Sequence, residues 1–221
     1  MKEKKNLLGL VFLTFLCSCG LSPFEESPSL VMPEETNIKQ ETTLFKESES
    51  ADAVVFEMND SKYLAANGYT FWTVPFINDM DKFSPMSVRV CKESGRMEAG
   101  FGLVFCEQKI NEKPFMLTAL INTGGLYAIG KISDGVFSHI NGGWKNSNYI
   151  NKGYGVRNDI SISFDDVKKD FMLKINGYKI TAFATAEEIV FKDSRYGFAV
   201  VIANNENFPS DSVKVTFENK Q

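Results

Sequence analysis

The side chains able to act as catalysts are few and scattered in this 221-residue chain. Its single histidine, His139, would have to serve any Ser-His-Asp or Cys-His arrangement, and no nucleophile elbow accompanies it. Glycoside hydrolysis needs two carboxyl groups, about 5 Å apart in a retaining enzyme. Glu98 and Glu107 flank an apolar segment, and Asp165 and Asp166 lie in an apparent turn, where carboxylates are usually solvated. We therefore predict no catalytic residue and no enzyme activity.

One pair of acidic residues has the spacing of a cation-binding loop. Asp79 and Asp81 are separated by one residue and could donate oxygens to Ca²⁺. Because Ca²⁺ takes six to eight oxygen ligands, two carboxylates without further ligand spacing are too few. The sequence predicts no metal site and no cofactor, with Ca²⁺ at this loop as the alternative.

Aromatic and amide side chains gather in the segment NGGWKNSNY. Sugars present apolar faces that stack on aromatic rings, and amides can bind hydroxyl groups. We therefore predict a ligand-binding loop formed by Trp144, Asn146, Asn148 and Tyr149. The alternative for these aromatic residues, and for Trp72 in a predicted strand, is packing within the domain.

Two cysteines, Cys17 and Cys19, end an apolar run that follows a basic start. The ten residues from Leu7 to Leu16 would span only about 15 Å as a helix, against the ~30 Å hydrocarbon core of a bilayer. A basic start, a short apolar run and then small residues are typical of a secretory signal peptide. We predict such a peptide over residues 1–18.

The stretch Leu16-Cys17-Ser18-Cys19 resembles the lipobox of bacterial lipoproteins, which has an aliphatic, a variable and a small residue before the lipid-bearing cysteine. The departure is Cys17, since that family usually has a small residue at the variable position. The resemblance implies cleavage after Ser18 and covalent diacylglycerol and acyl lipid on Cys19, which gives stable membrane anchoring. We expect a cell-envelope protein on a bacterial membrane, with the outer membrane or cell surface favoured over the inner membrane.

The charge of the chain is concentrated near its start. Residues 20–51 carry seven Glu against two Lys, and also three Pro, without a sustained apolar period. Such a segment cannot bury enough apolar surface to offset the entropy of ordering it. We predict that residues 19–51 form a lipidated N-terminus and a flexible acidic linker. The remainder, residues 52–221, is nearly neutral and has no basic cluster, which argues against nucleic acid as a partner.

Apolar residues alternate with polar ones along most of residues 52–221, as in ISISF at 160–164 and VKVTF at 213–217. Asn176-Gly177 lies between two such runs and predicts a type I′ hairpin, because both central residues of that turn need positive φ. The continuous apolar runs 100–106 and 198–203 predict strands that are covered on both faces. Many short strands at regular spacing indicate a β-sandwich or barrel.

Several segments resemble the concanavalin A-like, laminin-G-like jelly-roll domain of bacterial extracytoplasmic proteins. They are, in order, NGYTFWTVP, SVRVCKESGRMEAGFGLVF, LYAIGKISDGVF, FMLKINGYKITAF, RYGFAVV and SVKVTFEN. The resemblance implies an all-β, antiparallel jelly-roll β-sandwich. Such domains serve as carbohydrate-binding, protein-binding and glycosidase scaffolds. The E-x-D-x-E motif of the retaining glucanases of this wider fold does not occur in the sequence.

These observations predict a membrane-anchored lipoprotein that presents a recognition module for a glycan, or for a protein of the envelope or of a host. Two alternatives stay open. One is a glycoside hydrolase with an unrecognised catalytic pattern, and the other is a purely structural envelope lipoprotein.

Overall fold

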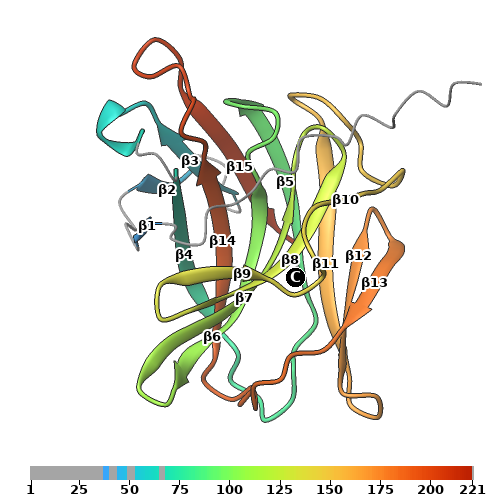
Figure 1. Ribbon diagram of the computed structural model, residues 1–221. Helices are drawn as coiled ribbons and strands as arrows, with labels where there is room; N and C mark the ends of the chain where they lie inside the picture. The colour runs from blue at the N-terminus through green and yellow to red at the C-terminus, as the bar shows by residue number, and fades with distance from the viewer. Residues whose placement is uncertain (1–36, 40–43, 49–52, 65–67, 221) are drawn as a thin grey trace, which may run out of the picture.

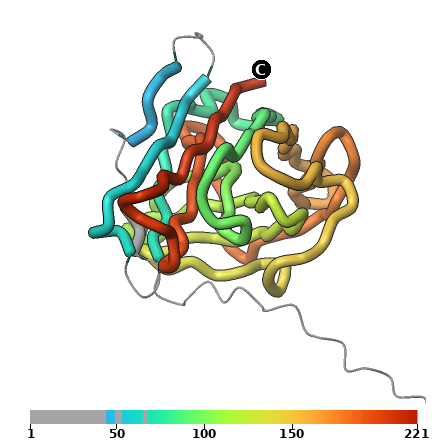
Figure 2. The backbone as a smooth tube through the Cα atoms, turned by 90° about the horizontal axis from the view of Figure 1, so that it is seen from above, coloured from blue at the N-terminus to red at the C-terminus, as the bar shows by residue number. Residues whose placement is uncertain are grey.

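A computed structural model describes residues 37–39, 44–48, 53–64 and 68–220 of the chain. The predicted signal peptide and Cys19 lie outside these described residues. The described part is built almost wholly from β-strands and contains no α-helix. Two sheets face each other as a sandwich (Figures 1 and 2), which confirms the predicted antiparallel β-sandwich.

The first sheet, called sheet A, has eight strands in the order β1-β4-β14-β6-β7-β8-β10, with β9 also paired to β8. Its strands are β1 (Asn37–Lys39), β4 (Tyr69–Ile77), β6 (Phe101–Ile110), β7 (Lys113–Ile121), β8 (Leu126–Ser133), β9 (Val136–His139), β10 (Lys145–Asn146) and β14 (Arg195–Ile202). Neighbouring strands are antiparallel except β1, which runs parallel to β4.

The second sheet, called sheet B, has seven antiparallel strands in the order β13-β12-β11-β5-β15-β3-β2. Its strands are β2 (Phe45–Glu47), β3 (Ala53–Met58), β5 (Met86–Ser94), β11 (Arg157–Asp165), β12 (Asp170–Ile175), β13 (Tyr178–Phe183) and β15 (Val213–Asn219). A short 3-10 helix, η2 (Ser61–Tyr63), follows β3.

Two strands lie inside the predicted linker and correct its extent. Asn37 of β1 pairs with Tyr69 of β4, and Phe45 of β2 pairs with Phe56 of β3. The rings of Phe45 and Phe56 lie 5.0 Å apart, and both side chains are buried. The folded domain therefore begins before residue 52, because β1 is paired with β4 and β2 with the following strand β3.

The main hydrophobic core fills the space between the two sheets and is rich in phenylalanine. For example, Phe198 of sheet A stacks on Phe217 of sheet B with ring centroids 4.7 Å apart. Aromatic pairs of this kind add about 0.5–1.5 kcal/mol beyond the burial of their area. The alternating apolar residues of the sequence are the ones that face this core.

Sheet A also has a buried apolar cluster on its opposite face, which we call the outer cluster. It consists of Trp72, Val74, Val104, Met116, Leu120, Ile132, Phe137, Ala199 and Val201, with Trp144 packed against it. The continuous apolar runs predicted to be covered on both faces form β6 and β14, at the centre of this sheet. That prediction is confirmed, since both strands contribute to the main core and to the outer cluster.

The predicted hairpin turn at Asn176-Gly177 is confirmed. It connects β12 to β13, and its φ angles are 51° and 84°. Strand β13 lies at one edge of sheet B, and β10 lies at an edge of sheet A. Figure 1 shows these two edge strands on the same side of the sandwich, opposite β1 and β2.

Candidate functional site

A surface groove lies where the edges of the two sheets meet. The predicted ligand-binding loop supplies Asn146, Asn148 and Tyr149, and β13 supplies Lys179 and Ile180. Tyr127 and Ser147 complete a cavity of about 290 Å³, which we call the edge groove. The structure thus brings three of the four predicted ligand-binding residues together at one site.

Two tyrosines stand side by side at this groove. The rings of Tyr149 and Tyr178 are stacked, with centroids 4.4 Å apart and planes inclined by 15°. Both rings stay open to solvent, since Tyr149 is 47% exposed and Tyr178 is 56% exposed. The Asn176 amide donates a 2.7 Å hydrogen bond to the Tyr149 carbonyl and so ties the loop to the hairpin that carries Tyr178.

The loop directs its amides outward and its small hydroxyl inward. The Ser147 side chain is buried, and its Oγ accepts a 3.2 Å hydrogen bond from the Tyr149 backbone N–H. The side chains of Asn146 and Asn148 are exposed and form no hydrogen bond with the described part of the chain. Each amide therefore presents both a donor and an acceptor to solvent beside the tyrosine pair.

Trp144 occupies a different environment, because it does not line the edge groove. Its ring covers Gly100 so closely that a Cβ atom placed there would lie 2.7 Å from Cη2 of the indole. The ring packs against the outer cluster and is only partly exposed. Its Nε1 is buried and has no hydrogen-bond partner among the described residues.

Three of the groups considered as catalysts, Glu107, Asp165 and His139, have structural partners. Glu107 forms an ion pair with Arg195 at 2.8 Å, and Asp165 caps a turn by accepting backbone N–H groups. His139 is half-buried with its ring edge-on to Phe137 at 5.0 Å. Burial lowers the pKa of the His139 imidazole, so this side chain is mainly neutral at pH 7.

Asp79 and Asp81, the acids that could bind Ca²⁺, are both exposed. Asp81 lies 4.0 Å from the ammonium group of Lys192. Within the described ranges no three His, Cys, Asp or Glu side chains gather as metal ligands would. The same part of the chain has no helix of the length and apolarity that crossing a membrane requires.

No protein-family model matches the sequence, and no curated protein matches it. Solved structures do match its fold. A native glycosidic hydrolase has a TM-score of 0.55 and 10% identity, over 83% of this chain and 82% of that one. A β-glucanase of Bacillus licheniformis has a TM-score of 0.52 and 8% identity, over 87% of this chain and 88% of that one. The carbohydrate-binding module CBM66 of Bacillus subtilis has a TM-score of 0.48 and 10% identity, over 79% of this chain and 88% of that one. The fold is therefore a jelly-roll β-sandwich, like that of the hydrolase and the β-glucanase.

These likenesses correct the prediction that the chain is not an enzyme. That prediction depended on the absence of a local carboxylate motif, yet a glycosidic hydrolase and a β-glucanase share the fold. Catalytic carboxylates must be close in space, and distant segments of a jelly roll can supply them without a sequence motif. The fold is one in which both binding modules and glycoside hydrolases occur, and it does not choose between them.

Proposed function

We propose that this protein binds a glycan in the edge groove and is held at a bacterial membrane by lipid on Cys19. The observation that carries the proposal is the exposed, stacked pair of Tyr149 and Tyr178 beside two unpartnered amides. Contact between an aromatic surface and water is unfavourable, so covering this surface with a ligand is favourable. Sugars offer apolar faces that can stack on such rings.

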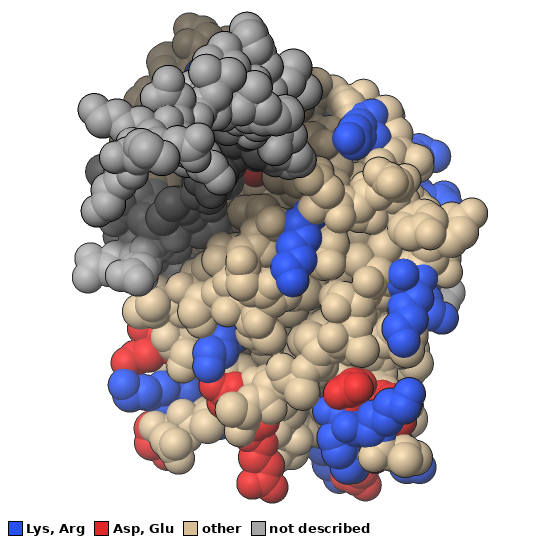
Figure 3. All heavy atoms as spheres, turned by 45° about the vertical axis from the view of Figure 1, so that its right-hand side comes forward, with Lys and Arg blue, Asp and Glu red and all other residues tan. Residues whose placement is uncertain are grey.

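The polar part of the groove supports the same ligand class. The amides of Asn146 and Asn148 can each bind a hydroxyl group as donor and as acceptor. On the side of the molecule turned forward in Figure 3, uncharged residues make up most of the surface, Lys and Arg side chains are scattered among them, and the acidic ones gather mainly at its lower end. Within the groove lining, Lys179 is the charged residue beside these amides. Amides that both donate and accept suit a hydroxyl-rich ligand.

The glycan proposal is tested on a glycan array with the full chain and with Tyr178→Ala. We expect the wild type to bind at least one glycan, and Tyr178→Ala to bind it about tenfold more weakly, which corresponds to about 1.4 kcal/mol of lost stacking. Val167→Ala is the control, since Val167 is 92% exposed in the turn between β11 and β12. Absence of any bound glycan, or equal binding by Tyr178→Ala, would contradict the proposal.

The lipid anchor is tested separately by membrane fractionation of cells that express the chain. We expect Cys19→Ser to release the protein from membranes, because this cysteine would carry the acyl chains. Cys17→Ser is the matched control and is expected to leave the protein in the membrane fraction, since Cys17 would be removed with the signal peptide. Equal behaviour of the two variants would refute attachment at Cys19.

A further inference from the structure

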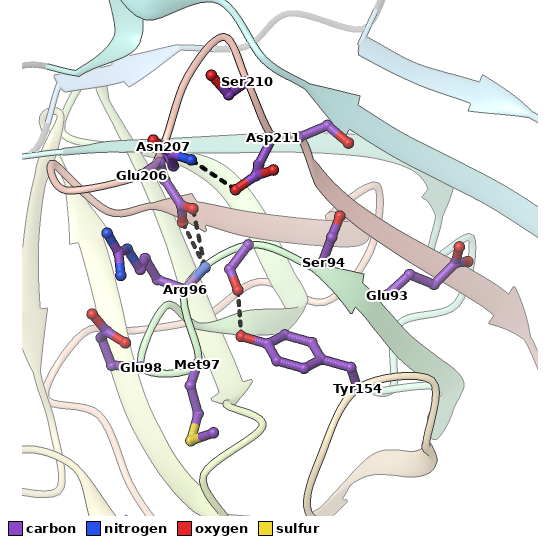
Figure 4. Close-up of a pocket in the computed structure, with 12 residues that line it drawn as sticks. Glu93, Ser94, Arg96, Met97, Glu98, Tyr154, Glu206, Asn207, Ser210 and Asp211 are labelled. Carbon is purple, nitrogen blue, oxygen red and sulfur yellow. Dashed lines mark hydrogen bonds between the residues drawn. The ribbon is translucent and has the colours of Figure 1, made fainter.

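A second and larger cavity lies at one end of the sandwich, between the β5–β6 turn and the loop before β15. Its volume is about 830 Å³, within the roughly 300–1,000 Å³ of typical small-molecule sites. In Figure 4, Glu206 from the loop before β15 and Tyr154 both point toward the β5–β6 turn. We call it the end pocket, and it is lined by Glu93, Ser94, Gly95, Arg96, Met97, Glu98, Tyr154, Glu206, Asn207, Ser210, Asp211 and Ser212.

The β5–β6 turn, which forms one wall of the end pocket, is held in place by hydrogen bonds from the side chains of Lys92 and Tyr154. Lys92 is buried, and its Nζ donates hydrogen bonds to the carbonyls of Arg96 at 2.6 Å and Ala99 at 3.1 Å. Burial lowers the pKa of the Lys92 ammonium to about 8. The hydroxyl of Tyr154 donates to the carbonyl of Gly95. A turn fixed in this way presents its side chains without a further ordering cost when a ligand binds.

The opposite wall is fastened to the same turn. The carboxylate of Glu206 accepts the backbone N–H of Arg96, with both oxygens 3.0 Å from the nitrogen. The Arg96 Nε donates to the carbonyl of Asn205 at 2.7 Å. Burial raises the pKa of the Glu206 carboxyl. Because both walls are joined by these bonds, the cavity between them is preformed.

The lining combines apolar and polar groups in the manner of a sugar site. Met97 is 50% exposed and Tyr154 is 44% exposed, so a thioether and an aromatic ring both face solvent. Hydroxyl groups of serine residues, the Asn207 amide and several carboxylates supply acceptors and donors around them. The described residues form no ion pair with Glu98 or Asp211. Each accepts a hydrogen bond from an amide, Glu98 from Asn205 at 3.5 Å and Asp211 from Asn207 at 2.9 Å. Their negative charges would repel an acidic sugar, and the oxygens not used in these bonds can accept hydrogen bonds from hydroxyl groups of a neutral one.

One short loop connects this cavity to the edge groove. Residues 147–156 carry Tyr149 into the groove and Tyr154 into the end pocket. Five residues span at most about 17 Å, so the two sites are neighbours on the surface. The loop is fixed in place, since Gly153 N–H donates to the Thr123 carbonyl and Gly155 N–H to the Lys92 carbonyl, each at 2.9 Å.

We infer that the edge groove and the end pocket are two parts of one binding path, and that the ligand is a neutral oligosaccharide long enough to occupy both. This inference rests on the proposed glycan binding in the groove and adds the length and the charge of the ligand. A short oligosaccharide would occupy the groove alone, whereas a longer one would reach the end pocket and gain the contacts of Glu98, Met97 and Tyr154.

The test is calorimetric titration of the full chain with a glucan disaccharide, a glucan hexasaccharide and a uronic-acid hexasaccharide. We expect the glucan hexasaccharide to bind at least about tenfold more tightly than the disaccharide, and the uronic-acid hexasaccharide to bind more weakly than the glucan one. Glu98→Gln removes a charge-assisted hydrogen bond and should weaken hexasaccharide binding about tenfold, with disaccharide binding unchanged.

Two further variants complete the design. Ser210→Trp places a large side chain at the rim of the end pocket and should abolish the tighter binding of the hexasaccharide. This variant tests the pocket even if the single carboxylate of Glu98 contributes little to binding. Glu112→Gln removes the same charge in an exposed turn between β6 and β7 and should change nothing.

The outcomes separate this inference from the proposed function. If the wild type binds a glycan on the array but neither glucan, the neutral oligosaccharide inferred here is overturned and the glycan proposal for the groove stands; if it binds no glycan at all, the glycan proposal itself fails. If it binds the disaccharide and the hexasaccharide equally, or if both pocket variants keep the advantage of the hexasaccharide, only the two-part path is overturned. Preference for the uronic-acid hexasaccharide would also overturn it.

Discussion

The aromatic residues of the edge groove and of the outer cluster have the same chemistry but opposite surroundings. Tyr149 and Tyr178 pack mainly on each other and remain about half exposed. Trp72 is 9% exposed within the outer cluster, and Trp144 covers Gly100 beside it. The comparison teaches that the residue type does not distinguish a ligand platform from a packing element, whereas burial does.

The difference has an energetic meaning. A buried indole stabilises the fold through its apolar contacts, so removing it lowers the free energy of unfolding. An exposed stacked tyrosine contributes little to stability, so its removal is expressed in ligand binding. The predictions below separate these two effects.

The largest effect is expected for Trp72, a buried member of the outer cluster. Trp72→Ala should lower the free energy of unfolding by about 3–5 kcal/mol, because it leaves a cavity beneath buried neighbours. Trp72→Phe should cost less, since the Nε1 of Trp72 has no hydrogen-bond partner to lose. Urea unfolding measures both variants, and a cost below about 1 kcal/mol for the alanine variant would show that the cluster does not stabilise the domain.

A smaller effect is expected where Trp144 covers Gly100. Gly100→Ala places a methyl group within contact of the indole and should destabilise the protein by about 1–3 kcal/mol through overpacking. Unfolding measurements on the double variant Gly100→Ala with Trp144→Ala provide the check, because the added methyl then meets no indole. If the double variant is destabilised by the full sum of the two single changes, the contact is not the cause.

A still smaller effect concerns pH and the outer cluster. Burial lowers the pKa of His139 in the folded protein, so the unfolded chain binds more protons near pH 6.5 and stability rises with pH through this region. We expect acidification from about pH 8 to pH 5 to destabilise the wild type more than His139→Gln, as followed by thermal unfolding. Parallel pH profiles for the two proteins would contradict a half-buried His139 that is neutral in the folded state.

Much of the fold could be predicted from the sequence, because alternation and turn residues act locally. The Asn176-Gly177 turn is predictable from its two residue types and from the alternating runs on either side of it. The turn at Asn111-Glu112 has φ angles of 51° and 66° but was missed, since glutamate does not favour positive φ. Pairing of Ile110 with Lys113 at the end of the long β6–β7 ladder imposes this turn.

The candidate site was predictable only in part. Asn146, Asn148 and Tyr149 lie in one segment whose composition indicates a ligand-binding loop. Tyr178 lies 29 residues beyond Tyr149, and its place beside that ring depends on how the edges of two sheets meet. The strands β1 and β2 are hard to find because their acidic, proline-containing surroundings resemble a linker. For β1 there is also a second reason, since its partner β4 is distant in sequence, whereas β2 pairs with the next strand, β3.

The most direct test of the account is to measure glycan affinity and unfolding free energy on the same preparations of wild type and Tyr178→Ala. Because Tyr178 is 56% exposed, the account predicts a change in unfolding free energy within about 0.5 kcal/mol and a loss of affinity of about tenfold. Unchanged affinity, or a large loss of stability that accounts for the loss of binding, would contradict it.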